Sequence, residues 1–246
     1  MAGQTEVAMH RSLLALIALA LLTPLQGWHE FRRFAAQVRS GVPDSRARVV
    51  LSSIRIQWIV TFALLAWWYL LGNDPARVGL VPGWSGWQWL AVGAGGAICA
   101  LMILQTVRAR KNPEELASLR SQLGDTALIA PGNAREKRLF DGLSITAGVC
   151  EETIYRGLML GLLAEQIGLW PAALVSTLLF GLAHAYQGFS GIVRTALAGA
   201  VAVLLTIFSG SIFVAVFVHA IVDMTQGRLL SAAVEAPEEE AAPQAA

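Results

Sequence analysis

Charged residues and cysteines are both scarce in this sequence of 246 residues. Only 14% of the residues are charged, whereas soluble domains carry about 25%, and 55% are hydrophobic, with a mean hydropathy of +0.57. Apolar stretches of about 20 residues, long enough for a helix to cross a bilayer, recur along the chain. The composition therefore excludes an ordinary soluble domain and predicts an all-α, polytopic transmembrane helix bundle.

The two cysteines, Cys99 and Cys150, lie inside apolar segments and form no CxxC or Cys/His spacing. A disulfide framework and a zinc knuckle are thus excluded. The chain also lacks the HExxH signature of zinc proteases, a GxGD aspartate motif and a nucleotide-binding loop. Nothing in the sequence resembles a nucleic-acid-binding surface.

Seven apolar segments are candidate membrane spans: 12–30, 56–72, 87–106, 139–163, 169–187, 193–209 and 211–227. The first also has the features of a signal-peptide core. No clear cleavage site follows it, so a retained span is favoured; its removal would leave six spans. We divide the chain into N-terminal spans and loops (1–134), a second bundle (135–228) and an acidic tail (229–246) predicted to be disordered.

Basic residues gather in two of the loops that join these spans. Loops 31–55 and 107–138 are rich in arginine, whereas the stretch 72–86 carries a single arginine. Because cytoplasmic loops carry the excess of arginine and lysine, we expect both basic loops and the C-terminus in the cytoplasm. The protein is then a multi-pass protein of the cell (inner) membrane, surrounded by lipid, with a surface helix over 112–124.

Ionisable side chains at membrane depth are rare in this chain. Each costs roughly 2.5–3.5 kcal/mol at the centre of a span, so its presence indicates a function by default. The set consists of Glu151, Glu152 and Arg156 in the fourth span, His184 in the fifth, and His219 and Asp223 in the seventh.

Helical spacing predicts how the charges of the fourth span are arranged. Glu152 and Arg156 are four residues apart, so they share one helix face and can pair. Glu151 is rotated by about 100° from its neighbour and can face a cavity. Such an ion pair also has a purely structural interpretation, in which it only holds helices together.

The other polar residues repeat the spacing of four. His219 and Asp223 share one face of the seventh span, and Phe180 and His184 share one face of the fifth. Either histidine by itself is readily explained as a buried hydrogen bond. Taken together with Glu151, however, they predict a polar catalytic cavity between spans four, five and seven that opens toward the cytoplasm.

A carboxylate and an imidazole on either side of one water molecule form a general-base pair. A second histidine with a polar partner can hold the carbonyl oxygen of a scissile bond as negative charge develops on it. Alternatively, Glu151, His184 and His219 could bind Zn²⁺ and leave a position for water. The residues leave both mechanisms open.

Three motifs occur in order: "EETIYRG" (151–157), "FGLAH" (180–184) and "HAIVD" (219–223). They resemble the motifs of the CPBP family of CAAX-protease and bacteriocin-processing membrane proteins, over about residues 135–226. The resemblance implies an intramembrane endopeptidase, similar to type II CAAX-prenyl endopeptidases, that cuts a membrane-associated or prenylated peptide or protein.

The resemblance also implies roles for single residues. Glu151 and His184 would activate the water, His219 and Asp223 would line the oxyanion side, and Glu152, Arg156 and Phe180 would support the site. Whether such proteins use Zn²⁺ or no metal is left open. Asp223 stands where several relatives have asparagine; an anion is a poorer oxyanion partner but a better metal ligand.

Two other classes of function remain as alternatives. The chain could be an immunity or peptide-binding protein that recognises a peptide without cutting it. It could also be an ion or proton transporter that uses the buried polar residues as a relay, although the outer ends of spans four to seven offer almost no charge for that role.

Overall fold

The computed structural model describes residues 2–70, 78–79, 86 and 88–236, without the side chains of 2–15 and 19, and these residues form helices and no strand. The helices are α1 (Ala2–Arg39), α2 (Ser45–Leu70), α3 (Gln88–Ala109), α4 (Pro113–Leu123), η2 (Gly124–Ile129), α5 (Ala134–Glu152), η3 (Thr153–Met159), α6 (Leu160–Ile167), α7 (Leu169–Ala183), η4 (Ala185–Gln187), α8 (Gly188–Ser209) and α9 (Phe213–Glu235). The predicted all-α bundle is thus confirmed.

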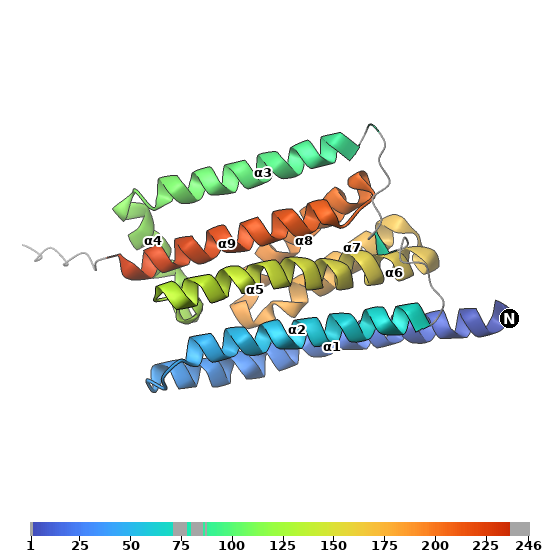
Figure 1. Cartoon of the computed structure of the whole chain (residues 1–246), viewed down its shortest axis with the longest axis horizontal. Coiled ribbons are helices and arrows are strands. Elements are labelled where there is room, and N and C mark those ends of the chain that lie inside the picture. Colours follow the sequence, from blue (N-terminus) through green and yellow to red (C-terminus); the bar gives the residue numbers. More distant parts are fainter. Residues whose placement is uncertain (1, 71–77, 80–85, 87, 237–246) are drawn as a thin grey trace, which may run out of the picture.

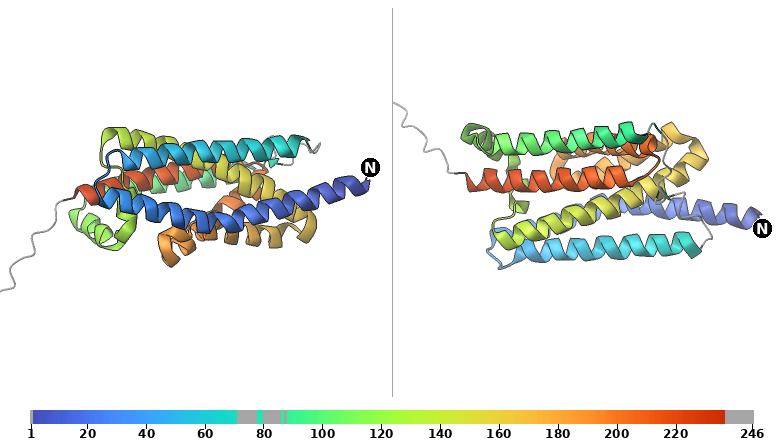
Figure 2. Two further views of the ribbon diagram at one scale, coloured as in Figure 1. Left: turned by 90° about the horizontal axis from the view of Figure 1, so that it is seen from below. Right: turned by 45° about the horizontal axis from the view of Figure 1, so that its top comes forward.

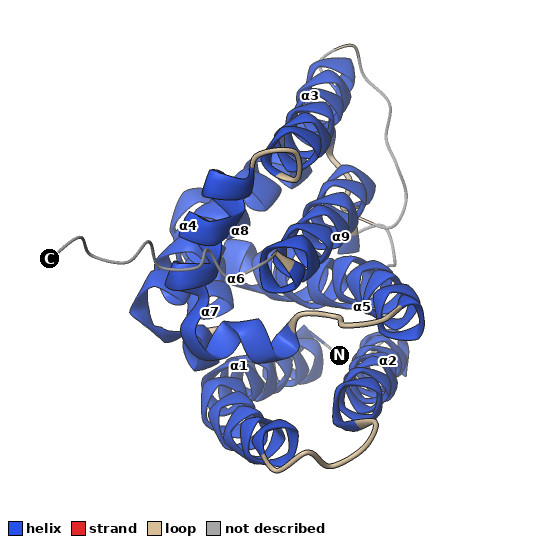
Figure 3. Cartoon of the chain, turned by 90° about the vertical axis from the view of Figure 1, so that its left-hand side faces the viewer, coloured by secondary structure: helices blue, strands red, loops and turns tan. Residues whose placement is uncertain are grey.

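The long helices run lengthwise beside one another (Figure 1). Seen from one end, α3, α9, α5 and α2 follow each other across the bundle, and α1 lies beside α2 (Figure 3). The hairpin of α7 and α8 packs against this row, and α1 extends past the other helices at its N-terminal end (Figure 2). α5 therefore lies in the middle of the bundle, between α2 and α9.

Among the described residues, four helical segments are long and apolar enough to cross a membrane: Ser45–Leu70, Gln88–Ala109, Ala185–Ser209 and Phe213–Glu235. α7 is apolar but shorter, and the helix over the fourth predicted span carries four charged residues and a change of helix type. Large apolar side chains such as Phe62, Phe189 and Phe217 point outward from the bundle. A surface of this kind belongs in lipid, so the chain is an integral membrane protein.

One end of the bundle is charged, because both basic loops meet there with the end of α9 (Figure 3). Ion pairs cross between the elements at this end: Arg39–Asp125, Arg135–Asp44, Lys137–Glu235 and Arg228–Asp141. The helix predicted over 112–124 is confirmed as α4, which starts where the Asn112 side chain accepts hydrogen bonds from the first backbone N–H groups. Its place on the membrane surface stays a prediction. The predicted outer stretch 72–86 lies outside the described residues apart from 78, 79 and 86.

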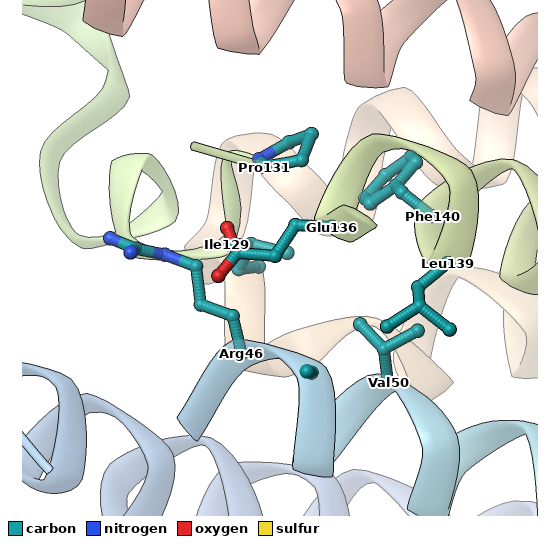
Figure 4. A pocket seen from close by; sticks show the side chains of 8 residues that line it. Arg46, Val50, Ile129, Pro131, Glu136, Leu139 and Phe140 are labelled. Carbon is teal, nitrogen blue, oxygen red and sulfur yellow. The ribbon is translucent and has the colours of Figure 1, made fainter. Parts of the chain in front are cut away.

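A small pocket lies at the charged end between α2, η2 and α5 (Figure 4). Apolar side chains such as Val50 and Phe140 line it together with Arg46 and Glu136. Arg46 donates to the carbonyl of Leu128, and Glu136 accepts from the backbone N–H of Gly132. These groups join the loop to the helices; the pocket is remote from the residues predicted for the active site.

The prediction that a disordered tail begins at residue 229 is wrong for residues 229–235, which are the last turns of α9. Ser231 donates to the carbonyl of Pro131, and Lys137 pairs with Glu235. These two contacts tie the end of α9 to the start of α5. The rest of the predicted tail, 237–246, lies outside the described residues.

The helices at the centre approach closely where α5 meets α9. A Cβ atom at Gly148 would lie 2.8 Å from the carbonyl oxygen of Val216 and 3.2 Å from the nitrogen of Ala220. Only glycine permits this backbone contact, as is typical where membrane helices pack tightly. The close approach brings the end of α5, with its two glutamates, against the middle of α9.

Candidate active site

The two glutamates end α5, and the chain continues as a π-helix, η3, over Thr153–Met159. The sequence predicted one uninterrupted helix over 139–163, so this change of helix type is a correction. The hydroxyl of Ser176 on α7 donates to the carbonyl of Tyr155 at 2.9 Å, and that of Thr153 donates to the carbonyl of Val149. These side chains bind carbonyls in and next to the π-helical turn, an element that is frequent at functional sites.

Glu152 is the central acceptor of the site and is fully buried. Its Oε1 atom accepts from Nη1 of Arg156 at 3.1 Å, as the spacing of four predicted, and also from Nδ1 of His219 on α9 at 2.7 Å. An ionised carboxylate only accepts hydrogen bonds, so Nδ1 of His219 carries the proton. Glu152 thus joins a cation on η3 to an imidazole on α9.

Arg156 has further partners on two other helices. Its Nη2 atom donates to the carbonyl of Gly199 on α8 at 3.0 Å, and its guanidinium carbon lies 4.1 Å from the centre of the Phe180 ring on α7. A Cβ atom at Gly199 would lie 2.9 Å from that Nη2 atom. The carboxylate, the carbonyl and the aromatic face together make this buried cation tolerable.

Glu151 differs from its neighbour because it is not tied down. Among the described residues, neither of its oxygens accepts a hydrogen bond, whereas Oε1 of Glu152 accepts two. The Oε2 atoms of both glutamates are buried without a hydrogen-bond partner. Oε2 of Glu151 lies 4.0 Å from Nε2 of His219, and the carboxylate interacts electrostatically with His184 and Asp223. Glu151 is therefore the carboxylate of the pair that can bind a further molecule.

His219 lies among three carboxylates. While Nδ1 donates to Glu152, Nε2 lies 3.5 Å from Oδ2 of Asp223 and 4.0 Å from Oε2 of Glu151. The sequence predicted Asp223 as the neighbour of His219; the structure places it there and adds Glu152 as the closer partner. The ring is therefore fixed on one side and faces the free carboxylate on the other.

His184 follows the last residue of α7, and its Nδ1 lies 3.0 Å from the carbonyl of Phe180. A carbonyl only accepts, so Nδ1 carries the proton and, in the neutral ring, Nε2 has the free lone pair. The ring of Phe180 lies 5.1 Å from the ring of His184 and 6.0 Å from that of His219. Phe180 thus separates and orients the two imidazoles from its buried position.

Sequence reasoning missed two tyrosines beside this cluster. Tyr155 packs edge-on against Phe180 at 5.1 Å, and its hydroxyl bonds to Thr23 of α1. Tyr186 lies 6.0 Å from His184 and 5.6 Å from Phe31 of α1. Tyr186 is only two residues from His184 in the sequence, but no pattern in the sequence indicates that α1 reaches the site.

The structure brings Glu151, Glu152, Arg156, Phe180, His184, His219 and Asp223 into one cluster. Within the described part of the chain, no three histidine, cysteine, aspartate or glutamate side chains are arranged to hold a metal ion. The metal-ligand set of Glu151, His184 and His219 therefore stays a prediction from sequence. The cavity expected between spans four, five and seven also stays a prediction.

Comparison with known proteins finds a family model that matches the segment carrying this cluster. Residues 139–225 match the family model described as type II CAAX prenyl endopeptidase Rce1-like, a range that includes all three motifs. No curated protein and no solved structure matches the chain. The resemblance read from the motifs is thus confirmed: the segment that carries the cluster matches the model of a family of type II CAAX prenyl endopeptidases.

Proposed function

We propose that this protein hydrolyses a peptide bond of a membrane-associated substrate with a water molecule activated by Glu151 and His184. One observation carries the proposal. Of two adjacent carboxylates, Glu152 accepts hydrogen bonds from both Arg156 and His219, whereas Glu151 accepts none from the described residues, and its buried Oε2 atom lies 4.0 Å from Nε2 of His219. A buried polar atom without a partner marks a place for a reacting molecule.

The chemistry needs only the side chains of the cluster. Water donates one hydrogen bond to the free oxygen of Glu151 and another to Nε2 of His184, the nitrogen that is left unprotonated by the Phe180 contact. As the water oxygen attacks the scissile carbonyl carbon, its proton moves to Glu151. The same proton then passes to the amide nitrogen, the C–N bond breaks, and an acid and an amine are released.

His219 holds the carbonyl oxygen in this mechanism. With Nδ1 bound to Glu152, its Nε2 is the atom that faces the reacting groups, at 4.0 Å from Glu151. A protonated Nε2 donates to the oxygen that becomes negative in the transition state. Glu152 and Arg156 act as positioning residues, because they fix the ring and do not touch the substrate.

The substrate reaches the site from the charged end of the bundle. α7 ends at Ala183 and α8 begins at Gly188, and this short hairpin turn carries His184. We place the charged end in the cytoplasm, because loops 31–55 and 107–138 hold most of the arginines. A peptide anchored in the inner leaflet, of the prenylated CAAX type or of a similar lipid-linked type, is the substrate that such a site can serve.

The test compares Glu151→Gln with Glu115→Gln, a substitution on the exposed face of α4. The purified protein is incubated with a prenylated CAAX-type peptide in detergent micelles, and the released product is measured by mass spectrometry. We expect Glu151→Gln to lower kcat by about 10²–10⁴-fold, the usual contribution of a general base, and Glu115→Gln to cleave normally. Cleavage by Glu151→Gln at the wild-type rate would refute the proposal.

A second arm of the same assay separates the metal-free mechanism from the metal-dependent one. Wild-type protein is assayed after treatment with a chelator and again after Zn²⁺ is added back. The mechanism above predicts unchanged cleavage in both conditions. Loss of cleavage on chelation and recovery with Zn²⁺ would instead assign Glu151, His184 and His219 to a metal site.

A further inference from the structure

Tyr186 lies at the edge of the site in η4, the short turn between α7 and α8. Its ring is held between two others, since Phe31 of α1 lies 5.6 Å away and His184 lies 6.0 Å away. Residues 27 and 31 of α1 share one helix face, and a Cβ at Gly27 would lie 3.6 Å from the Tyr186 ring. The position of the tyrosine is therefore fixed by a helix outside the region that matches the family.

The hydroxyl oxygen of Tyr186 accepts one hydrogen bond, whereas the hydroxyl hydrogen is donated to no described residue. Nε2 of Gln187 donates to its oxygen at 3.1 Å. An amide nitrogen can only donate, so the phenol oxygen is the acceptor in this contact. In the part of the chain that the structure describes, no hydrogen bond uses the phenol hydrogen, which remains available to a bound molecule.

The phenol lies beside the reacting groups, because its ring is 6.0 Å from that of His184. It interacts electrostatically with the carboxylates of both Glu151 and Asp223. Asp223 lies 3.5 Å from Nε2 of His219, so it occupies the position next to the expected oxyanion. A carboxylate cannot donate a hydrogen bond to a negatively charged oxygen, whereas a phenol can. The oxyanion side therefore lacks a neutral donor unless Tyr186 supplies it.

We infer that Tyr186 is a catalytic residue whose hydroxyl donates a hydrogen bond to the developing oxyanion, as a second donor beside His219. This inference rests on the proposed function. In the reaction, the phenol keeps its proton and no bond to it is broken; it stabilises the tetrahedral intermediate and releases the oxygen as the carbonyl of the acid re-forms. Phe31 is the corresponding positioning residue, because it supports the ring from α1.

Tyr186→Phe tests the inference because it removes the hydroxyl and keeps the ring. We expect kcat to fall by about 10²–10³-fold, as for loss of one oxyanion donor, with KM within about threefold. Binding of a phosphinate peptide, which carries a tetrahedral anionic centre, should weaken by a similar factor. Binding of the uncleaved substrate is measured with the inactive Glu151→Gln protein, and it should not change when Tyr186→Phe is added.

The chain offers a matched control, since Tyr69 at the end of α2 is exposed. Tyr69→Phe should cleave and bind the phosphinate like the wild type. A kcat for Tyr186→Phe within twofold of the wild type, or an unchanged phosphinate Kd, would overturn the inference. So would an equal loss of affinity for uncleaved substrate, which would make Tyr186 a ground-state contact. If Glu151→Gln cleaves normally, the proposed function itself fails, so the two failures are distinguishable.

Discussion

Replacement of Glu152 by glutamine tests whether the buried ion pair holds the site together. Glu152 is fully buried, and one of its oxygens accepts from both Arg156 at 3.1 Å and His219 at 2.7 Å. Glutamine has nearly the same shape and keeps an acceptor oxygen for His219. It removes the negative charge, however, and leaves the buried guanidinium without a counter-ion.

The expected loss of stability follows from that unpaired charge. Removal of one partner of a buried ion pair costs about 3–5 kcal/mol, and 1 kcal/mol shifts Tm by about 2–4 °C in a protein of this size. Glu152→Gln should therefore lower Tm by roughly 6–20 °C. Addition of Arg156→Met removes the orphaned cation, so the double variant should recover part of this loss, with a coupling of about 1–3 kcal/mol.

Thermal unfolding in one detergent is measured for the wild type, Glu152→Gln, Arg156→Met and the double variant, which together form a double-mutant cycle. Glu115→Gln on α4 is the control and should lie within about 2 °C of the wild type, as exposed substitutions do. A Tm for Glu152→Gln within about 2 °C of the wild type would refute the argument that this ion pair is desolvated and necessary for stability. Additive effects of Glu152→Gln and Arg156→Met would show that the two groups do not interact.

Two further predictions concern the surroundings of the pair. Gly199→Ala places a Cβ 2.8 Å from Phe180 and 2.9 Å from Arg156, so Tm should fall by an amount equal to about 1–3 kcal/mol of overpacking. Gly96→Ala on the exposed face of α3, where the Cβ meets nothing within 4 Å, should raise Tm slightly through helix propensity; equal shifts in the two variants would contradict the packing argument. Asp223→Asn should keep cleavage, measured with the same prenylated peptide, because an amide can donate where the carboxylate cannot; a loss of kcat beyond about 100-fold would assign the carboxylate itself a role in the reaction.

The sequence was sufficient to predict which polar residues cluster, because charge inside a membrane span is costly. Glu151, His184 and His219 stand out against apolar surroundings, and each lies on a different predicted helix. The spacing of four also predicted the ion pair of Glu152 and Arg156 correctly. These inferences need only the composition of a span and the period of a helix.

Contacts between helices could not be obtained in the same way. The bond from His219 to Glu152 depends on the closeness of α5 and α9, which Gly148 permits but does not specify. No proline or glycine at Thr153 indicates in the sequence that the π-helical turn begins there. The change from α- to π-helix keeps the Glu152–Arg156 pair but shifts the register of the residues after it, so a helical wheel drawn over 139–163 fails for α6.

α1 approaches the cluster near a point where a proline interrupts the backbone hydrogen bonds of that helix. Pro24 has no N–H to give to the carbonyl of Ala20, and the hydroxyl of Thr23 donates to that carbonyl instead, at 2.9 Å. The same hydroxyl is then the partner of Tyr155 on the π-helical turn. One proline thus couples the first helix to the segment that carries the two glutamates. Because family motifs record only residues 151–223, a helix that completes the site through such contacts is visible in the structure alone.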